Sequence, residues 1–135
     1  MKFTILNEKA TVPVRATKES AGYDLCSIES LVIRPGKSIL IKTGIGWDKV
    51  PSNVVGYIQP RSGHAYKNAI DTLAGVIDSD YINKDIGVIL INHGKIPFKI
   101  NAGDKIAQLV LHEFFVMPEE TKPTTKRIGG YGSTS

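Results

Sequence analysis

The chain has 135 residues, of which 41% are hydrophobic and 22% are charged. This length and balance fit one globular domain and exclude a disordered chain. The formal net charge of +4 suits an anionic ligand such as a nucleotide, although many solvated surfaces carry a similar excess. The single cysteine, Cys26, excludes an internal disulfide and a thiolate metal cluster.

Short β-rich runs separated by Gly, Pro and Asn follow one another along the chain. Residues 31–47, "LVIRPGKSILIKTGIGW", predict two strands that turn at Pro35 and Gly36. Further strands are predicted in "NVVGYIQP", "IGVILIN", "IPFKI" and "IAQLVLHEFFV". No window combines a helical period with helix caps. The pattern therefore predicts an all-β sandwich or barrel.

The composition changes after Met117, because residues 118–135 contain almost no aliphatic side chains. We therefore predict a β-domain over residues 1–117 and a flexible C-terminal tail over residues 118–135. A tail without function is one interpretation. However, Arg127, Tyr131, Ser133 and Thr134 are groups that bind phosphates or stack on bases, which favours a role at a ligand site.

The segment "GVIDSDY", residues 75–81, is an apolar run that ends in two aspartates. Asp78 and Asp80 stand at positions i and i+2, so their side chains point the same way in an extended segment. Aspartates are common in turns, and a polar strand end is one interpretation. A general base or a metal ligand is the other, since paired carboxylates perturb each other's pKa.

Three other segments carry candidate groups. In "PRSGHA", an arginine and a serine follow a strand directly, beside a glycine that would let a ligand approach the backbone, although an ordinary turn has the same composition. "AGYDLCS" contains Asp24, and "GDKIAQLVL" places Gln108 in an apolar strand. The three histidines lack metal-ligand spacing, so no zinc site is predicted.

Taken in order, "AGYDLCS", "PRSGHA", "GVIDSDY", "GDKIAQLVL" and "GGYGSTS" resemble the five motifs of the trimeric dUTPase family. The resemblance implies an all-β, jelly-roll-like subunit that forms a homotrimer. It also implies hydrolysis of dUTP to dUMP and pyrophosphate with Mg²⁺ on the triphosphate. Such a reaction keeps uracil out of DNA and supplies dUMP for thymidylate synthesis.

The resemblance also assigns roles by position. Asp78 would be the base that activates water, Asp24 would hold the metal through water molecules, and Asp80 would be structural within the turn. Tyr81 would pack under the deoxyribose and exclude a 2′-hydroxyl group. The remaining substrate contacts would come from the uracil-reading backbone of Gly75, Val76 and Ile77, from the phosphate-binding Arg61, Ser62, Gly63 and Gln108, and from the tail residues Arg127, Tyr131, Gly132, Ser133 and Thr134.

The chain departs from the family pattern at several positions. His64 stands where an aliphatic residue is usual, and Asn83 replaces a turn glycine. Tyr131 stands in place of phenylalanine and would stack on uracil. The commonest tail pattern puts its cation at Lys126, whereas Arg127 is the better match to a γ-phosphate.

Two other functions remain open from the sequence. One is a dCTP deaminase-like enzyme of the same fold, and the other is a catalytically inactive β-barrel that binds a nucleotide or a partner. We expect no stable nucleic-acid partner, because the few aromatic residues sit mostly within strands. We expect no membrane association and an intracellular, cytoplasmic location, or a nuclear one in a eukaryotic host, because no signal peptide or apolar span is visible.

Overall fold

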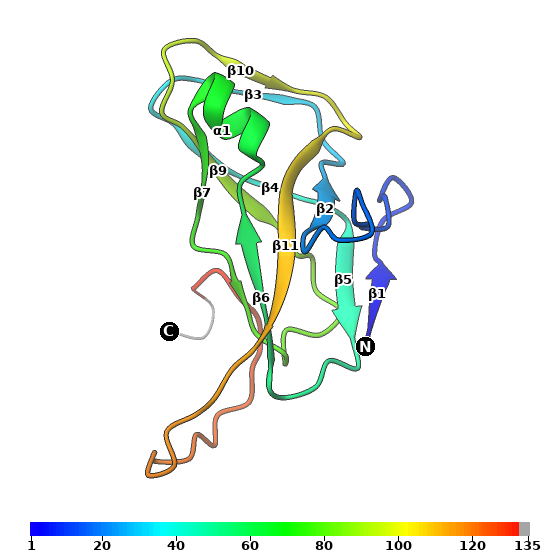
Figure 1. Cartoon of the computed structure of the whole chain (residues 1–135), viewed down its shortest axis with the longest axis vertical. Coiled ribbons are helices and arrows are strands. Elements are labelled where there is room, and N and C mark those ends of the chain that lie inside the picture. The colour runs from blue at the N-terminus through cyan, green and yellow to red at the C-terminus, as the bar shows by residue number, and fades with distance from the viewer. Residues whose placement is uncertain (133–135) are drawn as a thin grey trace.

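The computed structural model describes residues 1–132, which form β-strands around one apolar core with a single short helix (Figure 1). In chain order, the elements are β1 (Lys2–Ile5), β2 (Tyr23–Cys26), β3 (Leu31–Ile33), β4 (Ser38–Ile41), β5 (Ile45–Asp48), β6 (Val54–Gln59), α1 (Ser62–Asn68), β7 (Ile70–Leu73), β8 (Val76–Ile77), β9 (Val88–Asn92), β10 (Phe98–Ile100) and β11 (Lys105–Glu113). The all-β prediction is confirmed. No helix within residues 1–132 has the length and apolar character needed to cross a membrane.

The strands pair antiparallel in four sheets. The larger sheets have the orders β2-β11-β6-β8 and β4-β9-β7, and the two smaller ones pair β1 with β5 and β3 with β10. Among residues 1–132, no two strands that are consecutive in the chain pair with each other. Connections that cross between sheets in this way are typical of jelly rolls and Greek keys, in which sequence neighbours lie in different layers.

The turn at Pro35 and Gly36 shows this crossing most clearly. The two runs that flank it do form strands, but β3 pairs with β10 and β4 pairs with β9. The two predicted strands therefore turn at this point without pairing with each other. The turn moves the chain from one sheet to another, and Gly36 permits it with a φ of 77°.

No window of the sequence indicated a helix, yet α1 follows β6 directly. α1 has no buried residue and no side-chain cap at Arg61, and it ends at Ala69 in the left-handed conformation. A helix without an apolar stripe or a cap leaves no periodic signal in the sequence. "PRSGHA" is consequently the start of a helix instead of a simple turn.

Both larger sheets contribute to the same core. Leu25, Ile58 and Leu109 come from the four-stranded sheet, and Ile41 and Leu90 from the three-stranded one, all at most 4% exposed. Beyond β11, residues 114–132 contain no helix or strand. This segment runs away from the sheets, turns and comes back beside β6 (Figure 1).

Candidate active site

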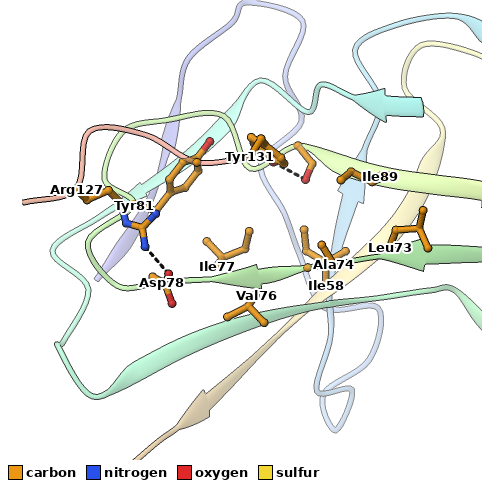
Figure 2. A pocket seen from close by; sticks show the side chains of 13 residues that line it. Ile58, Leu73, Ala74, Val76, Ile77, Asp78, Tyr81, Ile89, Arg127 and Tyr131 are labelled. Carbon is orange, nitrogen blue, oxygen red and sulfur yellow. Dashed lines mark hydrogen bonds and ion pairs between the residues drawn. The ribbon is translucent and has the colours of Figure 1, made fainter. Parts of the chain in front are cut away.

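Most of the predicted site residues line two separate pockets. The first, which we call the Asp78 pocket, has a cavity of about 280 Å³ and is shown in Figure 2. Its lining includes Gly75, Val76, Ile77, Asp78 and Tyr81 from the body, together with Arg127, Gly130 and Tyr131 from the tail. The tail is thus brought back to the aspartate motif, since Arg127 contacts Asp78 although 49 positions separate them in the sequence.

The backbone at Gly75 creates this pocket by moving the chain between sheets. Gly75 has a φ of 104°, and a Cβ atom there would lie 3.0 Å from the carbonyl oxygen of Ile58. The Ile58 N–H donates to the Gly75 carbonyl at 2.8 Å, which fixes the crossing. β8 then pairs with β6 and delivers Asp78 at its end. Only glycine combines this backbone conformation with so close an approach.

Asp78 and Asp80 share one cation from the tail. The Arg127 guanidinium donates from Nη2 to Asp78 Oδ2 and from Nε to Asp80 Oδ1 (Figure 2 draws the Asp78 contact). A cation between two carboxylates removes the repulsion that their spacing would otherwise cause. The hydrogen bond to Asp80, followed by the charges of both aspartates, raises the pKa of Arg127 above its usual value.

Tyr81 and Tyr131 form an aromatic wall of the same pocket. Their rings meet edge to face, with centroids 6.4 Å apart. The Tyr81 hydroxyl donates to the Asp85 carbonyl, and the Tyr131 hydroxyl donates to the Gly87 carbonyl, both at 2.8 Å. Burial raises the pKa of Tyr81, and desolvation around the hydroxyl raises that of Tyr131 although 52% of the whole residue is exposed. Both hydroxyls therefore stay protonated donors at neutral pH.

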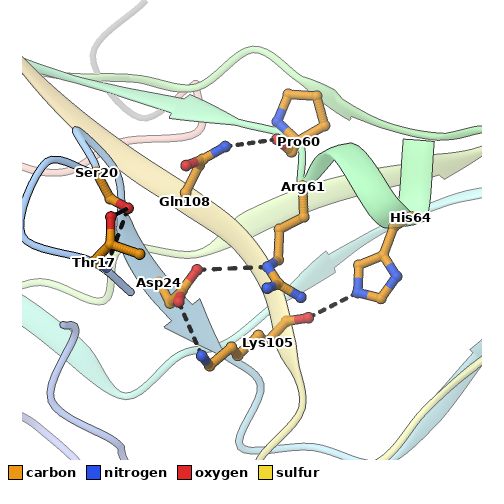
Figure 3. Close-up of polar contacts among 8 residues, drawn as sticks. All are labelled: Thr17, Ser20, Asp24, Pro60, Arg61, His64, Lys105 and Gln108. Atoms are coloured by element: carbon orange, nitrogen blue, oxygen red, sulfur yellow. Dashed lines mark hydrogen bonds and ion pairs between the residues drawn. The ribbon is translucent and has the colours of Figure 1, made fainter. Parts of the chain in front are cut away.

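The second pocket, which we call the Asp24 pocket, is polar (Figure 3). The predicted residues that line it are Asp24, Arg61, Ser62, Gly63 and Gln108, beside Ala16, Ser20 and Gly22. Asp24 is 8% exposed and pairs with Arg61 Nε at 3.5 Å and Lys105 Nζ at 3.1 Å. The cluster carries cations and N–H or O–H donors suited to phosphate oxygens.

The four-stranded sheet contributes different residues to the two pockets. Ile58, which lines the Asp78 pocket, pairs with Leu109 on β11. Gln108, the neighbouring residue on that strand, pairs with Asp24 and lines the Asp24 pocket. The two sets of lining residues have no member in common. Within residues 1–132, neither pocket therefore combines the predicted phosphate residues with the predicted base.

The Asp24 pocket fits a hydrated divalent cation better than a metal held only by protein. Within residues 1–132, no group of three or more His, Cys, Asp or Glu side chains could enclose a metal. Asp24 Oδ2 is buried and lies 3.1 Å from Lys105 Nζ, with which it forms an ion pair. A carboxylate oxygen is a ligand that Mg²⁺ uses, often with water and phosphate oxygens completing the shell.

A few groups were placed elsewhere or not anticipated. Gly132 follows Tyr131 and lines neither pocket, and Ser133 and Thr134 lie outside the described residues. Lys105, which pairs with Asp24, was not predicted as a site residue, although it belongs to the motif "GDKIAQLVL". His64, the departure from the family pattern, donates a 2.9 Å hydrogen bond from Nε2 to the Lys105 carbonyl (Figure 3).

Comparison with known proteins decides the family. A family model described as dUTPase matches residues 8–135. The chain belongs to the dUTPase family. It is 44% identical to the mitochondrial deoxyuridine 5'-triphosphate nucleotidohydrolase of Dictyostelium discoideum, over 96% of this chain and 73% of that protein. It is also 44% identical to the corresponding enzyme of Paramecium bursaria Chlorella virus 1, over 96% of this chain and 93% of that protein.

Solved dUTPase structures share the fold. A mutant dUTPase from phage phi11 of S. aureus, described with a structural Mg(II) ion, has a TM-score of 0.79 and 29% identity over 92% of this chain and 96% of its own. The Staphylococcus bacteriophage 80alpha dUTPase with dUPNHPP has a TM-score of 0.79 and 25% identity over 99% and 97% of the two chains. The resemblance of the five segments to the dUTPase family is thus confirmed.

Proposed function

We propose that this dUTPase-family chain hydrolyses dUTP to dUMP and pyrophosphate, with Asp78 as the general base. The observation that carries the proposal is the Asp78 pocket. In this pocket a partly exposed carboxylate lies beside a buried tyrosine and the Gly75–Ile77 backbone, which supports the roles proposed for these residues. The relatives named above are deoxyuridine 5'-triphosphate nucleotidohydrolases, which supports the same substrate.

In this mechanism Asp78 accepts a proton from a water molecule as the water oxygen bonds to phosphorus. The bond between the α-phosphoryl group and the bridging oxygen breaks, and pyrophosphate leaves with the electron pair. A positioned base of this kind typically contributes about 10²–10⁴-fold to the rate. Asp78 Oδ1 takes no hydrogen bond from residues 1–132, so it is the oxygen available to the water.

Substrate selection follows from the walls of the pocket. The Gly75–Ile77 backbone would pair with the uracil edge, and the Tyr131 ring would stack on the base. Tyr81 is 7% exposed and held by its hydrogen bond to Asp85, so it would leave no space for a ribose 2′-hydroxyl. A rigid wall rejects an added group by steric overlap.

The phosphate chain would be held by the Asp24 pocket and the tail. Arg61, Ser62, Gly63 and Gln108 would contact phosphate oxygens, while Arg127, Gly132, Ser133 and Thr134 would reach the terminal phosphate from the tail. Asp24 would hold Mg²⁺ through water, and the ion would neutralise charge on the triphosphate. A dUTPase solved with a structural Mg(II) ion supports the choice of metal.

Because no pocket within residues 1–132 holds both the predicted base and the predicted phosphate residues, the complete site would form between chains. We infer a homotrimer in which the Asp78 pocket of one chain meets the Asp24 pocket of a neighbour. Residues 118–135 would act as a flexible tail that closes the site. We keep the cytoplasm as the expected compartment, while some relatives are named mitochondrial.

A nucleotide panel tests the proposed function. We expect pyrophosphate release from dUTP, and much slower release from UTP, dTTP and dCTP. Ammonia release from dCTP would instead identify a deaminase. The Asp78→Asn variant should bind dUTP while its turnover falls by about 10²–10⁴-fold. Equal rates on UTP and dUTP would contradict the role of Tyr81, and full turnover by Asp78→Asn would contradict the assignment of the base.

A further inference from the structure

The carboxylate of Asp80 contacts the tail and not the turn in which it stands. Its one side-chain hydrogen bond within residues 1–132 is the 2.5 Å contact from Arg127 Nε. The expectation that Asp80 is structural within its turn is therefore not met. We propose that Asp80 is a positioning residue that docks the tail on the Asp78 pocket through Arg127 before a nucleotide binds.

The geometry of the guanidinium supports this role. Nε contacts Asp80 and Nη2 contacts Asp78, while Nη1 donates to the Gly129 carbonyl at 2.8 Å. A planar fork that bonds two carboxylates along one edge is fixed in orientation, whereas a single carboxylate would leave it free to pivot. The third contact bends the tail itself toward the pocket.

The residues after Arg127 continue the docked path. A Cβ atom at Gly130 would lie 2.9 Å from Tyr81 Cε2, so the tail backbone passes directly over that ring. The next residue, Tyr131, reaches the Gly87 carbonyl with its hydroxyl. With the tail in this position, the pocket still holds a cavity of about 280 Å³. The docked tail is consequently a wall of the pocket and does not fill it.

The docking contact is weak enough to open. The side chains of Asp78 and Asp80 are 51% and 62% exposed, while that of Arg127 is 19% exposed. Water and salt screen pairs of this kind, so the tail exchanges between docked and free positions. If the proposed function holds, Arg127 passes from the two carboxylates to the terminal phosphate when nucleotide enters, and Asp80 sets the place from which it starts.

Limited trypsin digestion of the ligand-free full chain tests the proposal without any substrate. Cleavage after Arg127 releases residues 128–135, which mass spectrometry quantifies. Asp80→Asn should speed this cleavage by roughly two- to fivefold, the effect expected from a partly exposed ion pair. Asp80→Glu should restore protection. Asp71→Asn is the matched control, because Asp71 is exposed and its carboxylate accepts a hydrogen bond from the Thr72 N–H, with no hydrogen bond or ion pair to the tail within residues 1–132.

A double-mutant cycle separates docking from an effect on the turn. In an Arg127→Gln background, where cleavage after Lys126 is followed, Asp80→Asn should add nothing. An additive effect, or wild-type cleavage of the Asp80→Asn chain, would overturn the proposal. A chain that fails to hydrolyse dUTP but shows Asp80-dependent protection would refute the proposed function alone. Hydrolysis without such protection would refute only the docking role.

Discussion

The separation of the two pockets predicts that two inactive variants restore each other. Asp78→Asn disables the Asp78 pocket, and Arg61→Gln disables the Asp24 pocket. Asp78→Asn should lower turnover by about 10²–10⁴-fold through loss of the base. Arg61→Gln removes a charge-assisted contact of about 1.5–3 kcal/mol, which corresponds to a loss of about 10–150-fold.

The size of the rescue follows from the geometry. In an equimolar random mixture, about half of the chains carry an intact Asp78 pocket and about half carry an intact Asp24 pocket. A site that takes one pocket from each of two chains is then intact in about one quarter of cases, since ½ × ½ = ¼. A site contained in one chain would give no intact sites, because each chain has one defective pocket.

The assay is pyrophosphate release after the two variants are unfolded together and refolded. We expect activity near one quarter of the wild-type value, about the fraction of intact sites. A mixture of Arg61→Gln with Gln108→Ala is the matched control, because both changes affect the Asp24 pocket and should give no rescue. Native mass spectrometry of differently tagged chains verifies that mixed assemblies form. Mixed assemblies without rescue would refute a site shared between chains.

Three further predictions concern the tail and the core. A chain that ends at Thr125 should keep its circular dichroism spectrum and thermal midpoint but lose most dUTP turnover. The reason is that the removed segment contributes walls of the pocket and no core residue. Full turnover by this chain would mean that the tail has no part in the mechanism. Gly130→Ala should raise the KM for dUTP and speed trypsin cleavage after Arg127, because the added Cβ atom would overlap sterically with the Tyr81 ring. Unchanged values of both quantities would mean that the tail does not pass over that ring. Asn92→Ala should lower the free energy of unfolding by about 1–3 kcal/mol in denaturant titrations. The change leaves the carbonyls of Ile33 and Ile96 and the N–H of Gly94 without their buried hydrogen-bond partner. A difference within experimental error would contradict this structural role of Asn92.

The sequence predicted what depends on local composition. Alternating apolar runs and turn residues predicted the all-β class, and the five segments predicted the family. The glycine at position 75 is also a local feature, because the positive φ of this residue beside an apolar strand favours glycine whatever its distant neighbours are. The helix α1 was missed because it has no buried residue and lacks a capping side chain.

Contacts between distant residues could not be predicted in this way. Arg127 reaches Asp80 and Asp78 across 47 and 49 residues, and no periodicity connects these positions. The pairing of Lys105 with Asp24 likewise depends on the register of β11 against β2. Neither the division of the candidate site into two pockets nor the partner of Asp80 follows from motif order, because both are set by which strands become neighbours.

The pairing of strands that are distant in the chain has a consequence for how the protein forms. β11, the last strand, lies inside the four-stranded sheet between β2 and β6. Such non-local pairing makes folding slow, because long loops must close before any pairing stabilises the chain. During synthesis β2 and β6 leave the ribosome well before their shared partner does. A nascent chain stalled before Lys105 therefore exposes the unpaired edges of two apolar strands, which is the condition under which β-proteins aggregate and chaperones bind.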